Sequence, residues 1–158
     1  MPMQVLPTEQ YFEMIKELLA AEGSAFVRVT GNSMCPLLHH LRDGVIIVPP
    51  KRIRLGDIVL FERRNGRYAL HRVIGKRSTS FTMAGDNQWH MEHNLPYEQI
   101  VGRVTHIVRD DRRIPVSKFS QRMYALAVTL WGWPRIYMCR AVKRLARPLK
   151  RVLRPRQE

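Results

Sequence analysis

Ser33 is the first residue whose type and setting suggest chemistry. It lies in Thr-Gly-Asn-Ser-Met-Cys-Pro, residues 30–36, between an extended apolar run and a polar Arg-Asp-Gly turn at 42–44. A serine hydroxyl is a poor nucleophile at neutral pH unless a neighbouring base takes its proton. Single serines in loops are more often turn residues or helix caps. The hypothesis that Ser33 is a nucleophile therefore depends on a base elsewhere in the chain.

His71 is the best candidate for that base. It lies in a strand-like run, residues 67–74, and a histidine on a half-buried strand titrates near neutrality and is held by its sheet. The alternative is a histidine on a solvated strand face. A third group should accept a hydrogen bond from the imidazole, and both Asp86 and Glu92 are available. Asp86 lies in Gly-Asp-Asn, which is also ordinary turn chemistry.

Two further sites are weaker candidates. Cys35 is an alternative nucleophile, although free cysteines are often small buried residues. His90, Glu92 and His93 are possible metal ligands, but they lack the helical spacing of known zinc motifs. A polar loop explains them better, so we expect no metal and no cofactor.

The elements that must position these residues are mostly short strands. Residues 8–21 have helical apolar spacing, and Gly23 follows as a stop signal. Asn65-Gly66 between two apolar runs predicts a β-hairpin, which places His71 on the strand face shared with Ala69 and Val73. The segment 90–99 is polar, and we expect it to be irregular. The expected strands are residues 25–30, 44–48, 58–63, 67–74, 80–83, 100–109 and 113–116.

Short strands without crossover helices predict a mainly β protein with a compact antiparallel domain at 25–116. An amphipathic helix within residues 1–24 precedes this domain, and a basic amphipathic helical tail at 117–158 follows it. The length of 158 residues suits one domain with appendages.

Charge is concentrated in the tail. The net charge is +14, and residues 112–158 contain 13 Lys and Arg but only one acid, so 13 − 1 = +12 of it lies there. A basic tail on a nearly neutral domain suggests a docking device. Only Cys35 and Cys139 are present, which suits a reducing compartment. The sequence has no secretory signal and no apolar stretch long enough to span a bilayer, so we expect a cytoplasmic protein.

The tail interleaves aromatic and basic residues. This pattern suits an interfacial helix whose cations meet anionic lipid at the inner face of the membrane. Nucleic-acid binding and packing on the β domain are the alternative roles for the tail. We expect no separate DNA-binding domain at the N-terminus, because 24 residues are too few for one. The expected membrane-docking residues are Trp131, Trp133, Arg140, Lys143 and Arg144.

Five sequence blocks, in order, carry a family resemblance. They are Gly-Asn-Ser-Met-Cys-Pro (31–36), Leu-Gly-Asp-Ile-Val (55–59), Leu-His-Arg-Val-Ile (70–74), Gly-Asp-Asn (85–87) and Ile-Val-Gly-Arg-Val (100–104). Their order and spacing resemble type I signal peptidases and their LexA-like relatives over residues 26–108. Because the position of the base is a histidine, the chain in particular resembles the Ser/His branch, which is found in archaeal and endoplasmic-reticulum signal peptidases.

The resemblance implies roles for individual residues. Ser33 would be the nucleophile, His71 the general base and Arg72 the arginine that follows the base. Glu92 would be the catalytic acid, with Asp86 as a possible orienter.

The chain departs from the family pattern in three respects. The usual serine two positions before the nucleophile is Gly31, so the oxyanion would rely on backbone N–H groups near Ser33, supported by Asn32, Met34 and Arg72. We also expect the family's N-terminal membrane anchor to be absent. Ala84-Gly85 resembles the LexA-like self-cleavage dipeptide but lies inside the Gly-Asp-Asn motif, so autoproteolysis is not expected.

The expected function is a serine endopeptidase that cleaves a peptide or protein at or near a membrane. The alternative is a weak or inactive peptidase-fold module that binds a peptide or partner, with a basic tail that docks on a membrane or on nucleic acid.

Overall fold

The computed structural model describes residues 7–88 and 90–116. The predicted basic tail, with its membrane-docking residues Trp131, Trp133, Arg140, Lys143 and Arg144, lies outside the described residues. Within the described ranges no helix is long and apolar enough to cross a membrane.

The chain begins with one helix and continues as strands. Helix α1, Thr8–Glu22, buries Ile15 and Leu19 on its apolar side. It ends at Gly23, which adopts φ 72° and donates its N–H to Leu19 O at 3.2 Å, because glycine tolerates the left-handed conformation that closes a helix. The strands are β1 Ala25–Arg28, β2 Gly44–Val48, β3 Ile58–Glu62, β4 Tyr68–Lys76, β5 Ser80–Ala84, β6 Met91–Pro96, β7 Ile100–Arg109 and β8 Arg112–Pro115.

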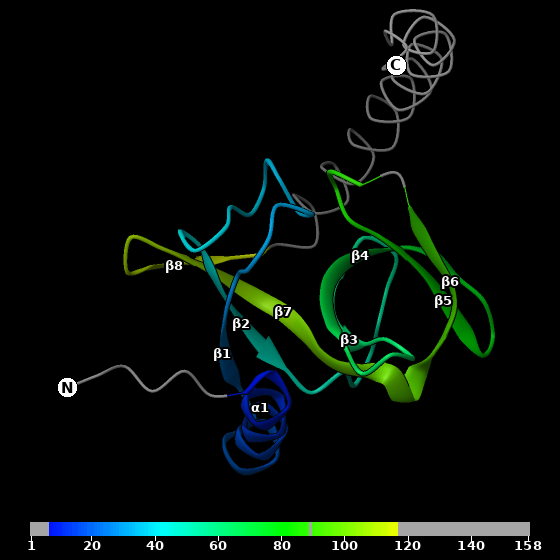
Figure 1. Cartoon of the computed structure of the whole chain (residues 1–158), viewed down its shortest axis with the longest axis horizontal. Helices are drawn as coiled ribbons and strands as arrows, with labels where there is room; N and C mark the ends of the chain where they lie inside the picture. Colours follow the sequence, from blue (N-terminus) through cyan, green and yellow to red (C-terminus); the bar gives the residue numbers. More distant parts are fainter. Residues whose placement is uncertain (1–6, 89, 117–158) are drawn as a thin grey trace, which may run out of the picture.

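The strands form one antiparallel sheet. Its order is β1-β2-β7-β3-β4-β5-β6, and β8 pairs with β7 off this path. The long strand β7 lies between β2 and β3 in this order, and β3 to β6 curl round beside it (Figure 1). The mainly antiparallel β fold with an N-terminal helix is therefore confirmed.

The Asn65-Gly66 hairpin is confirmed between β3 and β4. Gly66 adopts φ 73°, and the Arg63 N–H donates to Arg67 O at 2.8 Å to close the turn. Since the hairpin sets the register, His71 lies opposite Val59.

The expectation of an irregular segment at 90–99 is wrong. Strand β6 occupies its first part and a short 3₁₀ helix, η1 Tyr97–Gln99, its last part. Strand β6 is the end of the sheet path and buries only Leu95, so its polar sequence lacks the alternation of a half-buried strand. Asn94 adopts φ 56°, and the register with β5 shifts nearby. Pairing with β5, rather than local sequence pattern, creates this strand.

The core has two apolar clusters. The first joins α1 to β1, β2 and β7, with buried side chains that include Ile15, Val27, Met34, Val45 and Ile107. The second lies inside the curl of β3 to β6 and includes Val59, Phe61, Val73, Met83 and Leu95. The strand that carries His71 has neighbours in both clusters, because side chains alternate between the two faces of a sheet.

Candidate active site

The loop that carries Ser33 connects β1 to β2 and is anchored by a buried carboxylate. Asp43 is fully buried and accepts hydrogen bonds from Arg42, Arg109 and the His39 backbone N–H. Burial alone would raise the pKa of Asp43, but the hydrogen bonds from Arg109 and Arg42 outweigh it and hold the pKa well below its usual range. The loop is therefore fixed at its far end by a charged group that stays ionised.

The near end of the loop is fixed by packing. Met34 and Leu38 are buried in the first apolar cluster, and the Leu38 N–H donates to Met34 O at 3.0 Å. The side chain of Met34 thus supports the loop from below. Ser33 itself lies between this buried anchor and the surface, half-buried.

The Gly-Asp-Asn turn after β5 holds Ser33 from the other side. The Asn87 N–H donates to Ser33 O at 2.8 Å, and Asn87 Nδ2 donates to Asn32 O at 3.2 Å. A Cβ atom on Gly85 would lie 2.7 Å from Ser33 O and 3.1 Å from Ser33 Cβ. Only glycine permits this close approach of the turn to the nucleophile loop.

His71 lies on β4, next to the same turn. Arg72 pairs with Ala84 and Val73 with Met83 in the register of β4 and β5, so continuing the register by one residue places Gly85 opposite His71. The sequence predicts a half-buried His71 on the face of Ala69 and Val73. Both of these residues pack in the second apolar cluster, whereas His71 is more deeply buried than expected, with 1% of its surface exposed.

Glu92 is the carboxylate beside the imidazole. Its Oε1 lies 3.1 Å from His71 Nδ1, although the ring N–H is not aligned well enough with the oxygen for a hydrogen bond, so the contact is chiefly electrostatic. A carboxylate favours the proton on the nitrogen that faces it. We infer that Nδ1 carries the proton and that Nε2 is the basic nitrogen.

The electrostatic balance keeps His71 neutral. Burial lowers the pKa of His71 to about 4, against the opposing charge of Glu92, and the Arg63 cation lowers it further. The expectation of a histidine that titrates near neutrality is therefore wrong for the resting protein, because desolvation of the cation outweighs its carboxylate partner. For Glu92, burial alone would raise the pKa, but hydrogen bonds from Arg63 outweigh it and lower the pKa.

Asp86, the other predicted carboxylate, pairs with Arg72. Its oxygens accept from Arg72 Nε at 2.8 Å and Nη2 at 2.7 Å, and each side chain is 2% exposed. Arg72 Nη1 also donates to Gly56 O at 2.9 Å. Arg72 and Asp86 thus tie β4, the turn at Gly56 and the Gly-Asp-Asn turn together.

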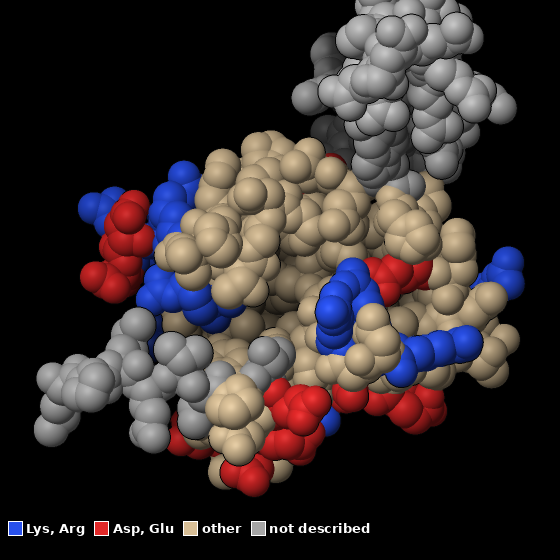
Figure 2. Space-filling view, viewed as in Figure 1, with Lys and Arg blue, Asp and Glu red and all other residues tan. Residues whose placement is uncertain are grey.

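Ser33 lines a cavity of about 260 Å³. One wall comes from β1 and the loop after it, the other from β3 and β4, with Phe12 of α1 at one end. Figure 2 shows a hollow near the centre of this face, with Lys and Arg side chains on either side of it. His71 is not among the lining residues, and within residues 7–88 and 90–116 no hydrogen bond joins the Ser33 hydroxyl to the His71 ring.

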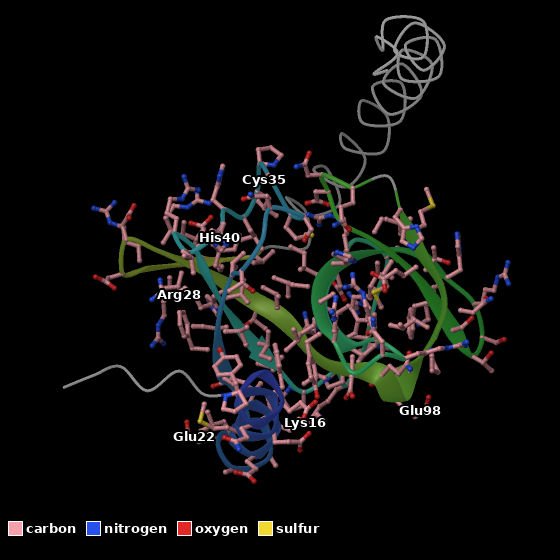
Figure 3. All side chains as sticks on the ribbon, in the orientation of Figure 1. Lys16, Glu22, Arg28, Cys35, His40 and Glu98 are labelled. Carbon is pink, nitrogen blue, oxygen red and sulfur yellow. The ribbon has the colours of Figure 1, made fainter. Side chains whose placement is uncertain are left out.

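The oxyanion donors are limited by Gly31. This residue adopts φ 96°, and its N–H already donates to His40 Nδ1 at 2.8 Å. Cys35 Sγ lies 3.7 Å from Asn32 Oδ1, so this contact engages the oxygen of the Asn32 amide and not its nitrogen. Cys35 and His40 lie on the Ser33 loop (Figure 3). Backbone N–H groups near Ser33 and the Asn32 amide are therefore the candidate donors.

The Cys35 thiol is engaged by its own loop. It donates to Leu38 O at 3.3 Å and lies 3.8 Å from His39 Nδ1. As for metals, the described part of the chain holds no group of three His, Cys, Asp or Glu side chains that could ligate an ion. Both Glu92 oxygens instead accept from Arg63.

Three residues of the site were not predicted from sequence. Arg63 binds Glu92 across 29 residues of chain, and no local pattern marks such a pair. Gly85 and Asn87 were visible as parts of the Gly-Asp-Asn motif, but as turn residues. Their contacts with Ser33 depend on a loop 50 residues away in the sequence.

The antiparallel β fold with its N-terminal helix fits a peptidase-fold domain, and the family comparison supports this class. A family model described as Peptidase S24-like matches residues 2–105. Since this match covers more than half of the 158 residues, the chain belongs to the Peptidase S24-like family. No curated protein matches the chain.

Proposed function

We propose that the protein is a serine endopeptidase in which Ser33 is the nucleophile and His71 the general base. The observation that carries the proposal is the shared anchor of the two residues. The turn at 85–87 holds Ser33 through Asn87 and lies beside β4, where His71 has a carboxylate on its Nδ1 side. Three segments that are distant in the sequence thus supply a loop serine, a buried imidazole and a carboxylate, the three groups that this mechanism needs.

The reaction would follow the usual sequence for such a group. His71 Nε2 takes the Ser33 proton as Oγ attacks the peptide carbonyl carbon, and the carbonyl oxygen becomes the oxyanion. Backbone N–H groups near Ser33 and the Asn32 amide stabilise that charge. His71 then protonates the leaving amine, and a water molecule activated by His71 releases the acyl group from Ser33.

The substrate would lie extended in the cavity beside Ser33. Within the described part of the chain β1 pairs only with β2, so its other edge is available to a peptide backbone. This edge forms a wall of the cavity through Val27, Val29 and Thr30. The mixed apolar and polar lining suits a peptide more than a small charged metabolite.

A serine-directed active-site probe tests the nucleophile. Labelling of the full chain should be lost in Ser33→Ala and reduced at least about a thousandfold in His71→Ala. Cys35→Ser is the matched control, and it should label as the wild type does. Equal labelling of wild type and Ser33→Ala, or labelling lost in Cys35→Ser, would overturn the assignment.

A second function is a peptide-binding module with weak or no turnover. It is favoured by Gly31, whose N–H is committed to His40, and by the absence of a Ser33–His71 hydrogen bond in the described structure. Losing one oxyanion donor typically costs about a hundredfold in rate. Binding and turnover of a tethered peptide library separate the two functions, because the module binds without cleaving.

We further propose that the chain is related to the Ser/His branch and acts at the cytoplasmic face of a membrane. The sequence of the basic tail at 117–158 supports the second point. Flotation of the full chain with anionic vesicles, compared with neutral vesicles and with a chain truncated after Val116, tests it. Equal flotation of both chains would exclude tail-mediated docking.

A further inference from the structure

Arg63 makes the strongest contact with the carboxylate beside His71. It lies directly after β3, and its Nε and Nη2 donate to Glu92 Oε2 at 2.9 Å and Oε1 at 2.7 Å. Such a bidentate pair fixes the plane of a carboxylate as well as its position. Glu92 Oε1 is also the atom that lies 3.1 Å from His71 Nδ1. One oxygen is therefore shared between a guanidinium and the imidazole.

The carboxylate depends on this support because its own strand constrains it poorly. Glu92 lies on β6, at the end of the sheet path, where the pairing with β5 shifts register. Its side chain is 14% exposed, and only Arg63 hydrogen-bonds to it among the described residues. A glutamate on such a strand has several rotamers within reach. The guanidinium selects the rotamer that faces His71.

Arg63 also belongs to the cavity of Ser33. Its side chain is 33% exposed and lines the cavity together with Ser33 and Leu70. The other arginine in the lining, Arg28, extends from β1 away from β4 (Figure 3) and reaches Leu41 O at 3.3 Å. Arg63 thus both lines the Ser33 cavity and binds Glu92, the carboxylate beside His71.

We propose that Arg63 is the positioning residue of the site: it holds the Glu92 carboxylate against His71 Nδ1 and thereby orients the imidazole toward Ser33. Its effect on turnover rests on the proposed peptidase function, whereas its effect on His71 does not. Arg63 touches neither of the reacting groups in the described contacts, so it acts through Glu92.

Charge makes the proposal measurable in the resting protein. Among the residues that the structure describes, three charged or titratable groups act on His71: Glu92 raises its pKa, whereas Arg63 and His90 lower it. The apolar neighbours Val59, Phe61 and Met83 carry no charge. Replacing Arg63 by a neutral residue removes a cation and also frees Glu92 to move away from the imidazole. Because Glu92 acts on His71 more strongly than Arg63 does, the pKa of His71 should fall.

The experiment compares Arg63→Gln with Arg64→Gln in the full chain. Arg64 is the matched control because it is the exposed next residue and carries the same charge. The His71 ring is titrated by NMR, and kcat and KM are measured against pH on a peptide substrate. Arg63→Gln should lower the pKa of His71 and lower kcat by roughly ten- to hundredfold with little change in KM. Arg64→Gln should change neither.

A double variant tests the route through Glu92. In a Glu92→Gln background, Arg63→Gln should lower kcat no further, because the group that Arg63 positions is already neutral. Additive losses would overturn the proposal. An unchanged or raised His71 pKa in Arg63→Gln would mean that Glu92 keeps its place without Arg63, and this result, or an effect on KM alone, would also overturn the proposal.

Two safeguards keep the test decisive. If Arg63→Gln does not fold, Arg63→Lys keeps the charge but not the two-pronged contact that holds Glu92, so it should lower the His71 pKa and still lose kcat. If the wild type shows no turnover, the peptidase function fails, but the NMR titration still decides whether Arg63 sets the state of His71.

Discussion

Asp86 and Arg72 form a buried two-pronged ion pair, with the Asp86 oxygens 2.8 and 2.7 Å from Arg72 Nε and Nη2. Arg72 directly follows His71 in β4, and Asp86 directly precedes Asn87, whose N–H holds Ser33 O. The pair therefore links the strand of the proposed base to the turn that supports the proposed nucleophile. Asp86 thus contacts Arg72, whereas Glu92 is the carboxylate that faces the imidazole.

The two carboxylates should respond differently to loss of charge. Asp86→Ala leaves Arg72 without its carboxylate in a buried site, so the free energy of unfolding should fall by about 3–5 kcal/mol. Glu92→Gln leaves the partly exposed Arg63, so stability should fall by about 1 kcal/mol or less. Urea denaturation at neutral pH measures both.

Glu92→Gln should reduce catalytic activity strongly, although it changes stability little. Glu92→Gln removes the charge that stabilises the imidazolium, so kcat should fall by about a hundredfold or more while the protein stays folded. Glu98→Gln, an exposed acid outside the site, is the control. If Glu92→Gln were fully active, the carboxylate would have no part in catalysis.

Gly85→Ala should damage the site more than the fold. A Cβ atom there would lie 2.7 Å from Ser33 O, so the turn and the Ser33 loop must move apart by several tenths of an ångström. We expect a loss of about 1–3 kcal/mol in stability and at least a tenfold loss of kcat, because small displacements of a nucleophile are costly. Gly66→Ala, where a Cβ meets no atom, is the control for kcat.

The free energy of unfolding should fall as the pH is lowered, because His71 is buried in its neutral form. The pKa of His71 is lowered from its ordinary 6.5 to about 4, so the unfolded state binds the proton first as pH falls. The contribution is fully present above about pH 6.5 and is lost progressively towards pH 4, amounting to about 3 kcal/mol at most. Denaturation midpoints between pH 7 and pH 4 test this.

His71→Gln should remove this part of the pH dependence, whereas His93→Gln, at an exposed position, should keep it. Glu92, with its lowered pKa, acts in the same direction at more acidic pH. An identical pH dependence in His71→Gln would show that other groups cause the loss.

Gly31→Ser should not supply the serine that the family usually has at this position. A Cβ there meets no atom within 4 Å, but φ is 96°, a conformation that L-residues rarely adopt. We expect a cost of about 1–3 kcal/mol and no gain in kcat. Gly31→Ala should lose the same stability, so the comparison isolates the hydroxyl. A gain of tenfold or more in Gly31→Ser alone would mean that the backbone can adapt.

Elements with a local signal were predicted well. The Asn65-Gly66 turn fixed the hairpin because Gly66 supplies the positive φ, 73°, that the turn requires. The apolar spacing of residues 8–21 gave the helix, with Gly23 as its end. Strand β6 was missed because an edge strand with one buried side chain does not alternate, and its pairing with β5 is not local.

The order of the motifs in the sequence by itself predicted Ser33, His71 and two candidate carboxylates as site residues. Only the tertiary structure decided between Asp86 and Glu92, since both lie within a few residues of the same turn and differ in which cation they meet. It also decided the state of His71, because the free energy of a buried charge depends on every neighbour that folding brings close. The type of a residue limits the reactions that it can support. Its electrostatic state depends on distances to other groups, which local sequence patterns do not specify.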